Sequence, residues 1–200
     1  MSTSSRAKRS YHHGDLPAAL LRAAGKILEK EGVEGLSLRA LTRRTGVSHA
    51  APYRHFTDRE SLLAALAAEG FALLGEAQRA AAEAAGLRGM GEAYVRFALA
   101  HPQRFRLMFG GQVQIARHPA LREIATKVFA GLSGALAARV PGALGAADAS
   151  IAAWALVHGL AQLLMEDRIA PGARGARTQE QFVRDVIATT RYAAGVAQPA

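Results

Sequence analysis

The residue types best suited to specific chemistry lie together between Ser48 and His55, in the stretch SHAAPYRH. An arginine such as Arg54 can bind one guanine through two N–H groups, and the imidazole of His49 can donate to or accept from a base edge. Tyr53 and His55 can donate hydrogen bonds to phosphate oxygens. We therefore place nucleic-acid binding ahead of any enzymatic function.

The flanking residues predict a helix-turn-helix that would position these side chains. Ser37 can cap a short helix with leucines on one face, and Gly46 ends its pattern. Ser48 can then cap a second short helix, over about residues 49–56. Two short helices joined by a glycine-containing turn are the signature of this motif. The second helix of such a motif enters the DNA major groove.

Further helices are expected on both sides of this motif. Apolar residues recur at helical spacing from about Asp15 to Glu31, which completes a three-helix core. Thr57 and Glu60 have the spacing of a capping box, and they would begin a long helix that fades near Gly86. Later helical segments are expected over about residues 89–101, 102–109, 118–140, 148–168 and 179–194.

The composition favours an all-α fold of about nine helices. Half of the 200 residues are hydrophobic, alanine and leucine are abundant, and no run of alternating β-branched residues occurs. The absence of cysteine excludes disulfides and thiolate metal sites. The N-terminus lacks the apolar core of a secretory signal. No apolar run approaches the roughly 18 residues of a membrane span, so we expect a cytoplasmic protein.

The charge is concentrated toward the N-terminus. Of the net charge of +9, residues 1–60 carry +5 (11 Lys or Arg against 6 Asp or Glu) and residues 61–200 carry +4 (14 against 10). A basic module is expected of a polyanion binder, although ordinary solvation of an arginine-rich protein explains the charge equally well. Residues 1–12 are predicted to form a disordered basic arm, either reaching DNA through Arg6, Lys8 and Arg9 or simply solvated.

Other chemistries find little support in the sequence. The chain has seven histidines, but none falls in a cluster with metal-ligand spacing. No phosphate-binding loop, dinucleotide-binding motif or nucleophile elbow is present. We expect no catalytic residue, metal or cofactor. Two alternatives to a sequence-specific DNA binder remain open, a non-specific architectural DNA binder and an enzyme on a helical scaffold.

Residues 11–66 strongly resemble the DNA-binding domain of TetR/AcrR-type transcriptional regulators. The resemblance rests on the EGVEGLSLRAL turn, the GVS turn and the Y-x-H-F end of the second motif helix. In the C-terminal part, FALAHPQRFRLMF and the arrangement of Trp154, His158 and Gly159 are similar to the WHG-type subgroup. The resemblance implies a helix-turn-helix domain over residues 13–58 and an effector-binding and dimerisation domain over residues 59–200.

The resemblance also implies roles for individual residues. Tyr53 and His55 would contact phosphates, and His49, Ala50 and Arg54 would face base edges. The remaining expected DNA contacts are Arg39, Ser48 and Arg59. Arg59 stands where relatives usually have a lysine for phosphate. Two alternatives stay open: Tyr53 as a core aromatic with a wet hydroxyl, and Arg39 as a solvated surface residue.

Three positions depart from the family pattern. Ala51 lacks a hydroxyl that commonly contacts phosphate at this position. Pro52 lies inside the expected recognition helix, where its missing N–H can shift the helix start. Thr42 replaces a small apolar residue, without an evident functional meaning.

We expect a repressor that binds a palindromic operator as a homodimer formed through the last two helices and that responds to a small-molecule effector. Helical ligand pockets are apolar with a few polar groups. Aromatic and neighbouring residues of the C-terminal part are the candidates for such a pocket, although each also suits a plain core: Phe97, Phe105, Met108, Phe109, Trp154 and His158.

Overall fold

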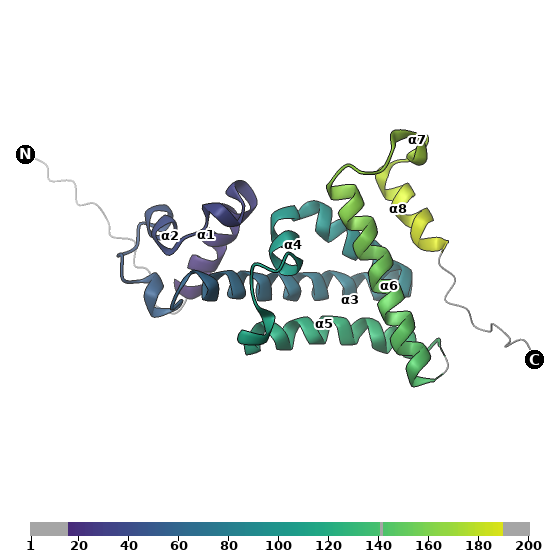
Figure 1. Cartoon of the computed structure of the whole chain (residues 1–200), viewed down its shortest axis with the longest axis horizontal. Helices are drawn as coiled ribbons and strands as arrows, with labels where there is room; N and C mark the ends of the chain where they lie inside the picture. The colour runs from purple at the N-terminus through teal and green to yellow at the C-terminus, as the bar shows by residue number, and fades with distance from the viewer. Residues whose placement is uncertain (1–15, 141, 190–200) are drawn as a thin grey trace, which may run out of the picture. The chain divides into compact units, whose positions relative to one another are not determined.

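The computed structural model describes residues 16–140 and 142–189, and in these residues every regular element is helical (Figure 1). The all-α prediction is confirmed. There are eight α-helices and three short 3₁₀ helices in this part of the chain: α1 Leu16–Glu31, η1 Val33–Gly35, α2 Leu38–Thr45, η2 Pro52–Arg54, α3 Arg59–Ala100, α4 Pro102–Phe109, η3 Ile115–Arg117, α5 Pro119–Ala137, α6 Ala143–Met165, α7 Pro171–Arg174 and α8 Gln179–Ala188.

The contacts divide the chain after Leu62 into two compact units, called here the N-terminal and the C-terminal unit. In the N-terminal unit, α1, α2 and the segment after them enclose a core of leucines with Phe56. Burial of these side chains removes apolar surface from water and is the main force holding the small unit together. The expected basic arm, residues 1–12, and the expected helix start at Asp15 lie outside the described residues.

Helix α2 begins and ends where the sequence predicts. The side chain of Ser37 accepts a hydrogen bond of 3.0 Å from the backbone N–H of Ala40, which satisfies one of the free donors at the helix start. Gly46 ends the helix in the left-handed conformation, at φ 68°, and donates to the carbonyl of Thr42. Because a side chain at this φ is strained, glycine suits the position.

The second helix of the motif is shorter than predicted. Over residues 49–56 the structure forms turns around η2, Pro52–Arg54, instead of an α-helix. Pro52 has no N–H to donate to an earlier carbonyl, and the N–H groups of Ala51, Arg54 and His55 each bond three residues back, in the 3₁₀ pattern. The proline therefore tightens this segment as well as shifting its start.

Helix α3 differs from the prediction at its start and contains the expected break. Asp58 and Ser61 form the reciprocal cap, with the Ser61 N–H donating to Asp58 Oδ1 at 2.7 Å. The predicted pair, Thr57 and Glu60, is therefore displaced by one position. Ala85 and Gly86 have non-helical dihedral angles, Gly86 at φ 59° and ψ −145°. That region is open essentially to glycine alone, so α3 is kinked into two helical segments.

The C-terminal unit consists of the rest of α3 with α4, η3, α5, α6, α7 and α8. Helix α6 starts at Ala143, earlier than the predicted start at Asp148, which lies inside the helix. Helix α5 packs against α6, and α6 against α8. The short helix α7 replaces an expected loop. Helix α8 ends at Ala188, and residues 190–194 of the predicted helix lie outside the described residues.

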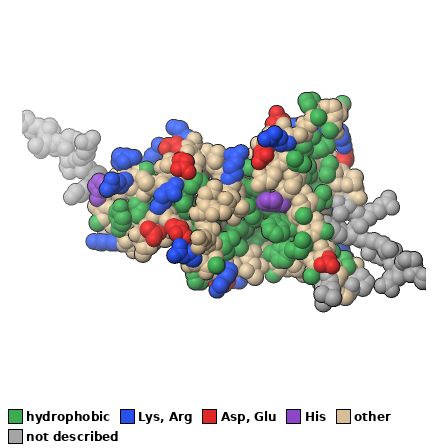
Figure 2. Space-filling model, viewed as in Figure 1, with side chains coloured by type: hydrophobic (Ala, Val, Ile, Leu, Met, Phe, Trp, Pro, Cys, Tyr) green, Lys and Arg blue, Asp and Glu red, His purple; other side chains and the backbone are tan. Residues whose placement is uncertain are grey.

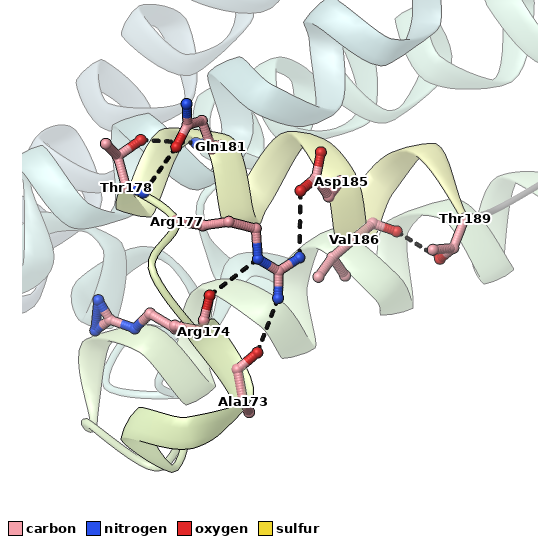
Figure 3. Close-up of polar contacts among 8 residues, drawn as sticks. All are labelled: Ala173, Arg174, Arg177, Thr178, Gln181, Asp185, Val186 and Thr189. Atoms are coloured by element: carbon pink, nitrogen blue, oxygen red, sulfur yellow. Dashed lines mark hydrogen bonds and ion pairs between the residues drawn. The ribbon is translucent and has the colours of Figure 1, made fainter.

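One arginine ties α7 to α8, as Figure 3 shows. Arg177 donates to the carbonyls of Arg174 and Ala173 at 2.9 and 2.8 Å, and to Asp185 Oδ2 at 3.2 Å. Its guanidinium also lies 4.9 Å from the ring centre of Phe182. The carbonyls at the end of a helix need such donors, so Arg177 fixes the turn that leads into α8.

Helix α6 is strongly apolar, although most of its apolar segment is not buried. Its segment Gly145–Met165 is long and apolar enough, by length and composition alone, to cross a membrane, and only 28 % of its most apolar window is buried. The expectation that no such stretch exists is wrong by this measure, because Asp148, Ser150 and His158 interrupt the apolar run without making it polar on average. Ile151 and Leu163 are 53 % and 48 % exposed, and Figure 2 shows hydrophobic side chains gathered over α5 and α6.

Candidate nucleic-acid interface and ligand cavity

The side chains expected to contact DNA are all exposed in the N-terminal unit. They come from α2, from the turns around η2 and from the first residue of α3: Arg39, Ser48, His49, Ala50, Tyr53, Arg54, His55 and Arg59. On the face drawn in Figure 2, Lys and Arg side chains and a histidine lie over α1, α2 and the segment that follows, with fewer Asp and Glu side chains among them. Exposed donors on a basic surface are what phosphate and base contacts require.

Two buried residues orient this segment. Pro52 is buried and Phe56 is only 7 % exposed, so these side chains anchor the segment to the core. Tyr53, Arg54 and His55 lie between them and are exposed. Tyr53 is 51 % exposed, which removes the alternative of a core aromatic. The proline that departs from the family pattern is therefore also the inner contact that turns its neighbours outward.

Arg59 has a structural role that the sequence did not indicate. Its Nε donates to the carbonyl of Leu36 at 2.8 Å, and its Nη2 donates to the carbonyl of Val33 at 2.6 Å. Both carbonyls belong to the turn between α1 and α2. Arg59 therefore joins the start of α3 to that turn, and its guanidinium is partly occupied before any phosphate approaches.

Thr42 and Arg39 show how α2 separates its inner and outer faces. Thr42 is 5 % exposed, and its hydroxyl donates to the carbonyl of Arg39 at 2.8 Å. A buried hydroxyl needs such a partner, so the family departure at Thr42 is accommodated inside the unit. The side chain of Arg39 lies on the exposed face.

The C-terminal unit contains a cavity of about 440 Å³. Its wall comes from both segments of α3 and from α4, η3, α5, α6 and α8. Gln78, Arg88, Tyr94 and Trp154 are the lining residues that have polar side-chain atoms. A cavity of this size with few polar groups is typical of a small-molecule site.

Two of the six residues expected at a pocket line this cavity. Phe109 and Trp154 belong to its wall. Phe105 is fully buried, and Phe97 and Met108 are 6 % and 4 % exposed; these three side chains form core around the cavity instead of its surface. The last of the six, His158, is half-buried beside the wall and is not one of the lining residues.

Tyr94 is the main residue that sequence reasoning overlooked. Its hydroxyl accepts a hydrogen bond from Trp154 Nε1 at 3.2 Å and lies 2.8 Å from Nδ1 of His158. Burial raises the pKa of Tyr94 and lowers the pKa of His158, so both side chains are uncharged at neutral pH. The four-residue spacing of Trp154 and His158 indicates that both lie on one face of a helix, but nothing in the sequence points to Tyr94.

Metal ligation has no structural support in the described part of the chain. Among residues 16–140 and 142–189, no three His, Asp or Glu side chains gather where they could hold one ion. The structure instead groups the exposed polar residues within the N-terminal unit and, separately, the apolar residues that line the cavity within the C-terminal unit.

Sequence comparison assigns both units to one family. Residues 20–66 match the bacterial regulatory proteins of the tetR family, and residues 87–189 match the tetracyclin repressor-like C-terminal domain. A stretch of 51 residues is 45 % identical to the class A tetracycline repressor protein from transposon 1721 of Escherichia coli. That match covers 26 % of this chain and 24 % of the repressor, so it spans about a quarter of the relative's length.

Solved structures share the whole fold. A protein with unknown function from Rhodococcus sp. RHA1 is 36 % identical, with a TM-score of 0.75 over 91 % of this chain and 94 % of that chain. The Q116A variant of TetR from Acinetobacter baumannii AYE, in complex with minocycline, is 20 % identical, with a TM-score of 0.58 over 86 % and 94 % of the two chains. The WHG-type subgroup stays a prediction. The chain belongs to the TetR family and is a transcriptional regulator with a helix-turn-helix DNA-binding domain.

Proposed function

We propose that the chain is a cytoplasmic repressor that binds a palindromic operator as a homodimer and is released from DNA by a small effector bound in the C-terminal unit. The observation that carries the proposal is the division of residues 48–56 into outward-facing polar side chains and two buried anchors. TetR-family regulators are generally DNA-binding proteins without enzymatic activity, and the related tetracycline repressor supports the repressor role.

Readout would be divided among the exposed residues. Tyr53 and His55 would hold phosphates and fix the register, whereas His49, Ala50 and Arg54 would face base edges. Arg54 suits a guanine, and the methyl group of Ala50 suits a thymine methyl. Arg59 would contribute mainly by holding the turn before α2, and through any N–H left for phosphate.

The proposed dimer would be formed by α6 and α8. Ile151, Ala155, Gly159 and Leu163 recur every four residues on α6 and form one ridge, which is exposed except at the half-buried Gly159. A methyl group added at Gly159 would meet no atom within 4 Å of the same chain. Ridges of this spacing pack into the grooves of another helix. A second copy would bury the apolar surface that a single chain leaves exposed.

Helix α3 supplies a physical connection between the two activities. It carries Arg59 at its first position, and Gln78 and Tyr94 line the cavity further along the same helix. An effector that prefers one arrangement of α3 would shift the population away from the DNA-binding arrangement. The minocycline-bound relative shows that this fold can hold a small molecule in one family member.

Selection of bound duplexes from a random DNA pool, with the full-length chain, tests the proposal. We expect recovered sequences with two-fold symmetry and half-sites about 34–36 Å apart or a multiple of that spacing. At physiological salt, the selected duplex should bind at least about 10³-fold more tightly than a shuffled one. Equal affinity for both duplexes would instead identify a non-specific architectural DNA binder, and no binding to either would remove the DNA-binding assignment.

A further inference from the structure

Two of the polar side chains that line the cavity already satisfy each other. Trp154 Nε1 donates to the hydroxyl of Tyr94, and that hydroxyl faces Nδ1 of His158. Because burial keeps His158 neutral, its Nδ1 can accept the only proton of the hydroxyl. The network therefore brings no charge to the wall and leaves neither the indole N–H nor the phenol O–H for a ligand.

Gln78 is the polar group that remains uncommitted. Its side chain is 7 % exposed, and within the described ranges no side-chain hydrogen bond joins it to another residue. It lines the cavity and also a neighbouring hollow of about 370 Å³ between α3 and α5. An amide carries one acceptor and two donor hydrogens, and burying them without partners is unfavourable. A ligand that fills the cavity would cover this amide and would therefore need to bond to it.

The remaining wall is aromatic and incompletely packed. Phe109 lies 5.3 Å from Phe71 and 6.3 Å from Trp154, and Phe129 lies 5.9 Å from Trp154, measured between ring centres. Rings at these separations form edge and tilted arrangements that a further ring can extend. Along α5, Val128, Phe129 and their apolar neighbours toward the cavity are only half-buried. An apolar ligand would bury this stripe.

Among the described residues that line the cavity, Arg88 alone carries a formal charge, and it shares one carboxylate with a second arginine. Arg88 Nε lies 3.5 Å from Glu92 Oε1, and Arg184 Nε approaches the same oxygen at 3.8 Å. The Arg88 side chain is 56 % exposed, so it lies at the rim, where water already solvates it. A charged ligand inside the cavity would lose its hydration, and the excess positive charge of Arg88 and Arg184 lies on exposed side chains, where it compensates little of that loss.

We propose that the cavity binds an uncharged, largely aromatic molecule, packed against Phe109, Trp154 and Phe129 and hydrogen-bonded to the amide of Gln78. This inference rests on the proposed effector role of the C-terminal unit and specifies its ligand class. The hydrogen bond to Gln78 selects among neutral aromatic molecules, and the apolar wall excludes anions and cations.

Two fluorescent probes that share one skeleton test the charge preference. N-phenyl-1-naphthylamine is neutral and has one N–H, whereas 1-anilinonaphthalene-8-sulfonate adds a sulfonate to the same rings. Titrated into the full-length chain, the neutral probe should bind once per chain and at least tenfold more tightly than the sulfonate. Equal or tighter binding of the sulfonate would overturn the inference in favour of an anion site at Arg88, and no binding of the neutral probe would also overturn it.

The variant Gln78→Leu tests the hydrogen bond while keeping the wall apolar. It should weaken N-phenyl-1-naphthylamine about threefold to tenfold, the range of one net hydrogen bond. The hydrocarbon 1-benzylnaphthalene, measured by competition with the fluorescent probe, lacks the N–H and should bind both proteins alike. Equal weakening of both ligands, or of neither, would remove Gln78 as the anchor.

A pair of matched substitutions on α5 locates the probe. Ala125 lines the cavity, whereas Ala130 is exposed on the same helix and is not one of the lining residues. Ala125→Phe should abolish probe binding, whereas Ala130→Phe should leave it unchanged; the opposite result would place the probe on the outer surface and overturn the inference. Operator affinity measured on the same samples keeps the two proposals apart, because a bound probe that leaves operator affinity unchanged contradicts the effector role alone.

Discussion

The two units of this regulator use buried and exposed residues in opposite ways. In the N-terminal unit the buried side chains form the core, and the residues proposed to act are exposed within residues 39–59. In the C-terminal unit the residues proposed to act surround an unfilled space, and they come from positions between Phe71 and Ala188. Under the proposed function, one unit would act through side chains that project outward, and the other through the space that its side chains leave empty.

This difference has a thermodynamic consequence. A buried core to which the DNA-facing segment is anchored holds that segment in one geometry, which direct readout of bases needs. A cavity and an exposed ridge leave apolar surface to be buried later, so a ligand or a second chain that buries it stabilises the bound state. We therefore expect substitutions in the N-terminal unit to change DNA recognition directly, and substitutions in the C-terminal unit to change assembly and response.

The largest effect should come from the exposed ridge of α6. Ala155→Arg places a charge in the middle of the proposed interface, where burying it without a partner is unfavourable. The chain should then sediment as a monomer, and operator affinity should fall on the order of 10²-fold or more because two linked half-site contacts become one. Sedimentation velocity and gel-shift titration measure the two quantities.

The matched control is Ala130→Arg, which places the same charge on the exposed face of α5. It should remain dimeric with unchanged operator affinity. If Ala155→Arg also remained dimeric, α6 would not form the interface, and the apolar ridge would need another explanation.

The next prediction tests whether the two units unfold independently. Leu41 is fully buried in the N-terminal unit, and Leu41→Ala should lower its free energy of unfolding by about 2–5 kcal/mol. Operator binding should be lost while N-phenyl-1-naphthylamine still binds the C-terminal unit. Two transitions in thermal unfolding, of which only one shifts, would show this directly. A shift of both transitions by the same amount would mean that the units unfold together.

A smaller effect distinguishes residues of the N-terminal unit that recognise bases from residues that hold its structure. Arg54→Ala removes an exposed side chain, so the stability of the protein should stay unchanged. Its binding to the selected operator should weaken by about 1–3 kcal/mol, and specificity should relax at one base pair. Arg59→Met removes both hydrogen bonds to the turn, because methionine has no donor, and should weaken selected and shuffled duplexes alike. Affinities for single-base variants of the operator test this. If Arg54→Ala weakened all duplexes equally, Arg54 would contact phosphate.

The sequence predicted the N-terminal unit well because its signals are local. Ser37 and Gly46 mark the ends of α2 through backbone geometry that depends on a few neighbouring residues. The same reasoning failed at Pro52, where a missing N–H changed an expected α-helix into η2, and at the start of α3, where Asp58 caps instead of Thr57. These errors are small because competing caps and turns differ by about 1 kcal/mol.

The cavity could not be predicted in the same way. Phe97, Phe105 and Phe109 lie at helical spacings and look alike in sequence, yet only Phe109 reaches the wall. A cavity is a space between elements that are distant in the sequence. No local sequence pattern predicts which side chains leave such a space unfilled. Tyr94 was overlooked for the same reason, because its partners Trp154 and His158 lie about 60 residues away in the chain.

The smallest predicted effect concerns the stability of the Tyr94–His158 pair against acid. Burial lowers the pKa of His158 in the folded chain, whereas the unfolded chain titrates near its usual pKa of about 6.5. The unfolded state therefore binds more protons as the pH falls, and stability decreases from about pH 6.5 downward through the lower folded pKa. Protonation also removes the lone pair of Nδ1 that accepts from Tyr94.

The variant His158→Gln isolates this contribution from the other histidines. Glutamine can still accept from the Tyr94 hydroxyl but does not titrate, so thermal unfolding of the C-terminal unit should lose less stability between pH 7 and pH 5 than in the unsubstituted chain. The difference should be modest because His158 is only half-buried. Identical pH profiles would mean that the pKa of His158 does not change on folding, and a charge would then lie beside the cavity wall in mild acid. The preference for uncharged ligands would in that case hold only above the pKa of His158, whereas the exposed residues proposed to contact DNA would be unaffected.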